Sequence, residues 1–193
     1  GTRVCARYTF VGAAYDASLL GDRSIPRPDP DAMDCYGHGT HVAGTAAGTG
    51  VTTARTTYTG PYDTSIDYSK LYIGPGVAPA ASIYALKIFG CDGSTNLTDA
   101  ALEWAVDPNQ DGDFSDHLDV INLSLGSQYG SEYDTSVTAA NNAALAGVIV
   151  VASAGNNGDI QLITSAPASA DRAISVAATQ HVADTIATFS SRG

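Results

Sequence analysis

Two histidines spaced three residues apart are the clearest candidates for chemistry in this sequence. His38 and His41 lie within residues 34–48 (DCYGHGTHVAGTAAG), a stretch of small residues that predicts a short helix ending at Gly48. Both imidazoles could bind one metal ion, but the glutamate that follows the first histidine in HExxH zinc sites is absent. His41 fits a structural group in the core better, whereas His38 could serve as a general base.

A general base at the start of a helix needs a partner. The helix dipole disfavours the imidazolium that forms when the base accepts a proton. His38 would therefore require a carboxylate that orients the ring and stabilises its charge. Asp34 is close in sequence but suits the loop or a substrate cleft better. The residues alone leave the partner of His38 open.

An acidic loop at residues 107–116 (DPNQDGDFSD) is a second candidate site. Its possible ligands to a structural calcium ion are Asp107, Asn109, Asp111 and Asp113. Oxygens at alternating positions followed by a glycine turn are typical of calcium loops. The bidentate acid expected at the twelfth position is missing, because Leu118 stands there. A calcium site and a solvated acidic turn both remain open.

The elements that would position these residues form an α/β pattern in the second half of the chain. We expect strands at 81–89, 119–125, 148–151 and 173–178, and helices at 98–106 and 134–147. Thr98 and Asp134 fit the N-cap positions of the two helices. Strands that alternate with helices predict a mostly parallel central sheet with crossover helices on both faces. Residues 148–151 are all β-branched, which is typical of a strand buried on both faces.

The first half is less regular. Residues 3–11 could form an edge strand, and residues 49–76 are rich in Thr, Tyr and Gly without a sustained period. We interpret residues 49–76 as a surface insertion. A chain of 193 residues is expected to form one domain around one core.

Composition and charge exclude several classes of function. A net charge of -11 and the presence of only Lys70 and Lys87 as lysines argue against a nucleic-acid partner. No run approaches the ~20 apolar residues of a membrane-spanning helix.

The three cysteines are Cys5, Cys35 and Cys91. In a secreted or cell-surface protein, one disulfide plus one further thiol is expected, with three buried thiols as the alternative.

Five blocks of this sequence resemble, in order, those of the subtilisin-like serine endopeptidases, the subtilase family. They are GHGTHVAGT, GVAPAASIYALKI, DVINLSLGS, VIVVASAGNNG and APASADRAISVAAT, and they cover most of residues 34–179. The resemblance implies the α/β fold of the family and hydrolysis of polypeptide substrates without a cofactor for the chemistry. In that mechanism a serine attacks the carbonyl, a histidine accepts its proton and an aspartate orients the histidine.

The resemblance assigns roles to individual residues. His38 matches the catalytic base, and Asn156 matches the asparagine whose amide donates to the oxyanion. The stretch that pairs with the peptide and walls the primary specificity pocket corresponds to Ser124, Leu125 and Gly126. The opposing edge segment corresponds to Gly93, Ser94 and Thr95. Substrate would then bind as an added strand through main-chain hydrogen bonds.

The resemblance also implies structural details and a partner. It brings the segments of Cys35 and Cys91 to the same cleft, which predicts a disulfide between them. It further predicts a cis peptide bond between Ala166 and Pro167. A pro-segment is the further partner that the family implies.

Two parts of the family pattern are not found in these residues. No Asp-Thr-Gly or Asp-Ser-Gly turn precedes His38, and the Gly-Thr-Ser block around the nucleophile is absent. We therefore expect residues 1–193 to be a central segment of the peptidase domain, incomplete at both ends and inactive alone. The alternative is a non-catalytic peptide-binding module on the same fold.

Overall fold

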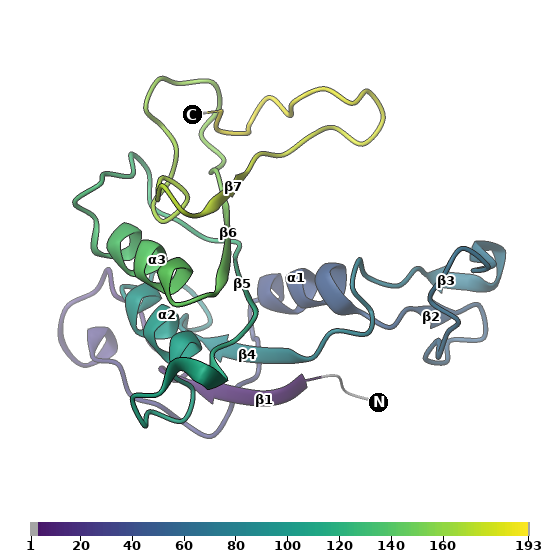
Figure 1. Cartoon of the computed structure of the whole chain (residues 1–193), viewed down its shortest axis with the longest axis horizontal. Coiled ribbons are helices and arrows are strands. Elements are labelled where there is room, and N and C mark those ends of the chain that lie inside the picture. Colours follow the sequence, from purple (N-terminus) through teal and green to yellow (C-terminus); the bar gives the residue numbers. More distant parts are fainter. Residues whose placement is uncertain (1–3, 193) are drawn as a thin grey trace. The chain divides into compact units, whose positions relative to one another are not determined.

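The structure, a computed structural model, describes residues 4–192, and the chain divides into two compact units, Gly1–Asn96 and Leu97–Gly193. The strands pair in three sheets, and two of these sheets contain only parallel neighbours (Figure 1). The predicted α/β class with parallel strands is therefore confirmed.

The described part of the first unit contains a parallel strand pair and one α-helix. Strand β1 (Val4–Thr9) pairs with β4 (Ile83–Lys87), and both precede loops that carry candidate site residues. Helix α1 (His38–Ala47) is followed by the insertion, after which the chain returns to the end of the helix. There the N–H groups of Val77 and Ala78 donate to the carbonyls of Thr45 and Ala46 at 3.0 and 2.8 Å. This return satisfies carbonyls that a helix end otherwise leaves without partners.

Residues 49–76, expected as an irregular insertion, contain a short antiparallel ribbon. Strands β2 (Val51–Thr52) and β3 (Leu71–Ile73) pair, and a 3-10 helix η2 (Tyr68–Lys70) precedes β3. The Arg55 guanidinium lies 3.3 Å from the centroid of the Tyr72 ring. A cation–π contact leaves no periodic pattern in the sequence, which explains why the ribbon was not predicted.

The second unit is a parallel sheet with two packed helices. Strands β5 (Val120–Leu123), β6 (Ile149–Ser153) and β7 (Ile174–Val176) are neighbours in that order. Helices α2 (Thr98–Val106) and α3 (Thr135–Leu145) contribute to the same apolar core as β5 and β6. Its largest fully buried members include Leu102 and Val150. Short 3-10 helices occur at Gly21–Ser24 in the first unit and Phe114–Asp116 in the second.

Some local expectations are confirmed and others are wrong. Asp134 caps α3 by accepting from the Ser136 N–H at 2.9 Å, and the Ala166–Pro167 bond is cis, as predicted. Thr98 is not an N-cap, because α2 begins at this residue and Leu97 occupies the cap. Strand β6 is not buried on both faces, since Val150 is buried while Ile149 is 52% exposed. Among the described residues, no helix is long and apolar enough to cross a membrane.

Candidate active site

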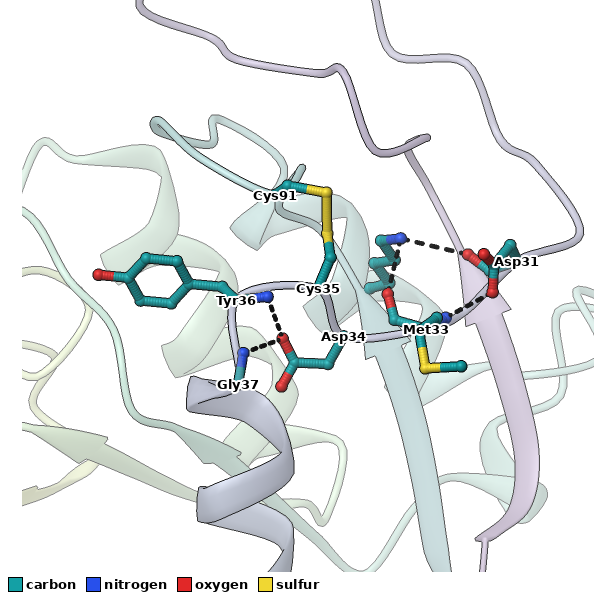
Figure 2. The surroundings of a disulfide bond; sticks show 8 residues. Asp31, Met33, Asp34, Cys35, Tyr36, Gly37 and Cys91 are labelled. Carbon is teal, nitrogen blue, oxygen red and sulfur yellow. Dashed lines mark hydrogen bonds between the residues drawn. A yellow bond between two sulfur atoms is a disulfide. The ribbon is translucent and has the colours of Figure 1, made fainter.

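His38 is the first residue of α1 and is exposed. Its position depends on Asp34, whose carboxylate accepts from the N–H groups of Tyr36 and Gly37 at 3.0 and 2.8 Å (Figure 2). The same carboxylate accepts from the Thr40 N–H at 2.6 Å. Gly37, the N-cap residue, has a φ of 93°, a backbone angle that glycine adopts without steric cost. Asp34 therefore caps the helix from outside, and it fixes the turn that presents His38.

The carboxylate of Asp34 is held in its charged form. Partial burial raises its pKa, but the hydrogen bonds from Thr40, Gly37 and Tyr36 outweigh this effect and lower the pKa from 3.8 to about 2. As expected from the sequence, Asp34 serves the loop. Within residues 4–192, no carboxylate forms a hydrogen bond or ion pair with the His38 imidazole.

A disulfide joins the His38 loop to the predicted edge segment of the substrate site. Cys35 pairs with Cys91, as predicted, with a Cα–Cα distance of 5.1 Å (Figure 2). Cys35 lies three residues before His38, and Cys91 lies two residues before Gly93. Lys87 also holds the preceding loop, because its Nζ donates to the carbonyls of Asp31 and Met33. The third cysteine, Cys5, is exposed rather than buried.

The segment of Gly93, Ser94 and Thr95 is positioned by a residue that the sequence analysis missed. The carboxylate of Asp16 accepts from the Ser94 N–H at 3.0 Å, and Ala17 N–H donates to the Ser94 carbonyl at 3.0 Å. Thr95 Oγ1 donates to the Ile88 carbonyl at 2.6 Å. The only local signal for Asp16 was its Asp-Ala-Ser turn, which by itself does not identify a contact 78 residues away.

In the second unit, Ser124 and Asn156 line one pocket of about 280 Å³. Ser124 directly follows β5, and Asn156 lies in the turn after β6. The carboxyl ends of parallel strands meet at one edge of a sheet, where open α/β folds bind ligands. The structure thus brings together two site residues that are 32 positions apart in the sequence.

Hydrogen bonds fix the wall of this pocket. Ser153 Oγ donates to the Leu125 carbonyl at 3.2 Å, and Ser165 Oγ donates to the Ser153 carbonyl at 2.8 Å. A Cβ on Gly126 would lie 2.7 Å from Ser165 Oγ, so the absent side chain lets the two segments approach. Leu125 and Gly126 are not among the residues that line this pocket, but side-chain hydroxyls hold them next to Ser124, which does line it.

The turn of Asn156 is held from a later part of the chain. Gly155 has a φ of 112°, and its carbonyl accepts from the Ser191 N–H at 2.9 Å. Ser191 Oγ in turn accepts from the Asn157 N–H at 3.3 Å, and Ser191 is fully buried. The turn leaves the Asn156 side chain exposed, so its amide can donate to a bound group.

The acidic loop uses its side chains on its own backbone. The Asp107 and Asn109 side chains accept from the Asp111 N–H at 3.2 and 2.9 Å, and Asp111 accepts from the Asp113 N–H at 2.8 Å. In residues 4–192, no three His, Cys, Asp or Glu side chains are grouped so that they could hold a metal ion. Calcium at this loop stays a prediction.

His41 is not in the core. It is exposed on α1, and its N–H donates to the Gly37 carbonyl at 3.0 Å within the first turn. The expectation of a buried structural histidine was based on the small residues around it. The buried residue of α1 is Ala47, at the far end of the helix.

Comparisons with known proteins identify the family of this chain. The model of the subtilase family matches residues 11–193. Subtilisin BL of Lederbergia lenta is 35% identical over 181 residues, covering 93% of this chain and 56% of the relative. The thermostable alkaline protease of Halalkalibacterium halodurans is 35% identical over 161 residues, covering 82% of this chain and 36% of the relative.

A solved structure supports the same conclusion. Sphericase is similar with a TM-score of 0.65 and 28% identity, covering 98% of this chain and 60% of the sphericase chain. The chain thus spans between about a third and three fifths of the length of these relatives. By the match of the family model over nearly all of its length, this chain belongs to the subtilase family of serine proteases.

Proposed function

We propose that this chain belongs to a serine endopeptidase that hydrolyses peptide bonds with a Ser/His/Asp triad. His38 would be the general base, and Asn156 would stabilise the oxyanion. The observation that supports this most is the pocket at the carboxyl edge of β5 and β6, where Ser124 and the turn of Asn156 meet. An amide donor beside a pocket suits a reaction in which negative charge develops on a carbonyl oxygen.

Each catalytic group has a defined task in this proposal. A serine hydroxyl from outside residues 1–193 attacks the peptide carbonyl, and His38 accepts its proton. An aspartate, also from outside these residues, would orient His38. The Asn156 amide then donates to the oxyanion of the tetrahedral intermediate. In subtilisin itself, loss of this donor costs about 10²–10³ in turnover.

The substrate would bind in extended form. Ser124, Leu125 and Gly126, and separately Gly93, Ser94 and Thr95, offer main-chain groups that can pair with a peptide backbone. Recognition through the main chain tolerates many side chains, so we propose a broad specificity.

We also propose an extracellular location and a pro-segment partner. The Cys35–Cys91 disulfide supports the location, since disulfides persist in oxidising compartments. A structural calcium ion at Asp107, Asn109, Asp111 and Asp113 is a further proposal. Isothermal titration of the protein with calcium would test it, and unchanged heats after Asp111→Ala would count against this loop.

Labelling by a fluorophosphonate probe tests the function. The polypeptide extended on both sides of this chain is treated with the probe, which reacts covalently with an activated serine. We expect labelling of the wild type, loss of labelling in His38→Ala and normal labelling in His181→Ala, a control in which another exposed histidine is changed. Residues 1–193 alone should not be labelled.

Absence of labelling by the probe would contradict the proposed function. A folded, processed wild-type protein that the probe does not label would reject the endopeptidase. A peptide-binding module without catalysis would then be the remaining proposal. Binding of an extended peptide without its cleavage would support that module.

A further inference from the structure

Asp16 connects two segments of the first unit that are distant in sequence. Its Oδ1 accepts from the Ser18 N–H at 3.0 Å, from Ser18 Oγ at 2.7 Å and from the Ser94 N–H at 3.0 Å. The residue is only 8% exposed. Ala17 N–H adds a bond to the Ser94 carbonyl at 3.0 Å, so both main-chain groups of Ser94 are held by residues 16 and 17.

We propose that Asp16 is a positioning residue for the substrate-pairing segment of Gly93, Ser94 and Thr95. This inference rests on the proposed function. Both main-chain groups of Ser94 are bonded to Asp16 and Ala17, so the segment is fixed at its central residue. Under the proposed function, Gly93 and Thr95 on either side of Ser94 belong to the segment with which an extended peptide would pair.

Steric contacts support the same role. Gly93 has a φ of 88°, and a Cβ there would lie 2.1 Å from Cγ of Asp16. A Cβ on Gly90 would lie 2.2 Å from the carbonyl oxygen of Tyr15. Both glycines are therefore required for the approach of residues 90–96 to residues 13–17. We call the contact between these two segments the Asp16 clamp.

Two further bonds close the clamp at its ends. The Cys91 N–H donates to the Ala13 carbonyl at 2.8 Å, and the hydroxyl of Tyr15 donates to the Asn96 side chain at 2.6 Å. Tyr15 is 3% exposed, so the contact is also packed. Ser94, the partner of Asp16, thus lies between the two anchored residues Cys91 and Asn96.

The loop that carries Asp16 is itself folded back. The Asp16 N–H donates to the Arg23 carbonyl at 2.9 Å, and Arg23 Nε donates to the Ala14 carbonyl at 2.9 Å. The bonds to Ser18 and Ser94 lower the pKa of Asp16 to about 2, so the carboxylate stays charged at neutral pH. A charged acceptor makes a stronger hydrogen bond to Ser94 than a neutral one would.

The chain contains a matched control for this arrangement. Asp63 accepts from the Ser65 N–H at 2.8 Å and from Ser65 Oγ at 2.6 Å, in the same local turn as Asp16 and Ser18. Within residues 4–192, the side-chain hydrogen bonds of Asp63 stay within that turn, whereas Asp16 reaches Ser94. Replacement of Asp63 therefore removes the turn contacts but leaves the clamp intact.

The test compares a long and a short reactant on the extended polypeptide. The long one is a peptide substrate with four residues before the cleaved bond, and the short one is a small fluorophosphonate that needs only the activated serine. We expect Asp16→Ala to lower kcat/KM for the peptide about tenfold or more through KM, and Asp16→Asn to lower it less. The labelling rate should change less than about twofold, because the clamp acts on the peptide backbone alone. Asp63→Asn should leave both values unchanged.

The outcomes separate the possible failures. An equal fall of labelling and peptide hydrolysis in Asp16→Asn would show a general structural role and overturn the proposal. If kcat/KM for the peptide is unchanged in the Asp16 variants, the proposal is overturned as well. Labelling of the wild type by the probe would in that case still support the proposed function. If Asp16→Ala does not fold, the Asn variant decides alone. A wild type that the probe does not label would reject the proposed function, and this role with it.

Discussion

The two halves of this chain hold their site residues by different means. In the first unit the buried apolar residues are few, Val11, Tyr15, Ala47 and Ile88 among those described. Its site segments are fixed by the Cys35–Cys91 disulfide and by hydrogen bonds to carboxylates. In the second unit, the pocket residues follow strands whose core is packed against two helices. Charged carboxylates and a disulfide hold the site segments of the first unit. In the second unit, burial positions the strands, and neutral serine side chains hold the turns that follow them.

The difference has a physical reason. A loop has too little apolar surface to be held by burial, and its main-chain groups need partners. Hydrogen bonds satisfy these groups, and a disulfide links the loops covalently. Hydrogen bonds to carboxylates depend on pH, and the disulfide depends on redox conditions. Burial of apolar surface is insensitive to both. The stability of the first unit should therefore depend on pH and redox conditions. The stability of the second unit should depend mainly on the volume of its buried side chains.

Removal of the disulfide should have the largest effect. The double change Cys35→Ser with Cys91→Ser opens a loop of 56 residues, and loop-closure entropy predicts a loss of about 4 kcal/mol in the free energy of unfolding. Hydrogen exchange should accelerate around residues 34–38 and 91–95. Equal acceleration of exchange in β5 and β6 would contradict the view that the disulfide stabilises mainly the first unit.

A cavity in the core should come next. Leu102 is 1% exposed, so Leu102→Ala should lower the free energy of unfolding by about 3 kcal/mol, within the usual range for such changes. Urea unfolding measures this loss, which should be the same with and without a reducing agent. A dependence on the reducing agent would show that the disulfide and the core are coupled.

Acid should weaken the first unit through Asp34. Its pKa is about 2 when folded and near 3.9 when unfolded, so its stabilising effect is present above pH ~4 and is lost as the pH falls towards 2. The urea midpoint of Asp34→Asn should therefore fall less than that of the wild type between pH 5 and 2.5. Glu132→Gln, an exposed change in the second unit, is the control. An identical fall in wild type and Asp34→Asn would contradict the prediction.

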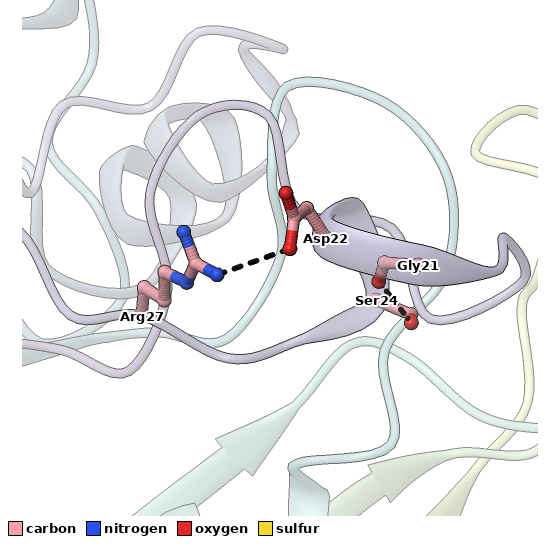
Figure 3. A network of polar contacts seen from close by, with 4 residues as sticks. All are labelled: Gly21, Asp22, Ser24 and Arg27. Atoms are coloured by element: carbon pink, nitrogen blue, oxygen red, sulfur yellow. Dashed lines mark hydrogen bonds and ion pairs between the residues drawn. The ribbon is translucent and has the colours of Figure 1, made fainter.

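The smallest effect is expected for an exposed ion pair. Arg27 and Asp22 are 3.2 Å apart, with side chains 66% and 87% exposed (Figure 3). Arg27→Ala should change the free energy of unfolding by roughly 0.2–1 kcal/mol, because water and salt screen exposed charges. A loss above about 2 kcal/mol in the free energy of unfolding would show that this ion pair stabilises the loop more than exposed ion pairs usually do.

Local patterns in the sequence determined the class of fold and indicated His38 as a candidate general base. The helices of the second unit, the Asp134 cap and the strands follow from periodicity and turn residues within short windows. The role of His38 as the catalytic base and the assignment of Asn156 came only from resemblance to the family, and both belong to the proposed function. The Cys35–Cys91 pairing followed only from resemblance to the family, because spacing alone leaves the connectivity of three cysteines open.

The tertiary structure alone decided which distant groups meet. The bond between Asp16 and Ser94, the exposure of His41 and the one-sided burial of β6 have no signature in neighbouring residues. Each depends on how segments far apart in the chain pack and on which polar groups then need a partner. Such contacts are a property of the folded chain, because a carboxylate, an imidazole or a β-branched side chain has the same local pattern whether buried or exposed.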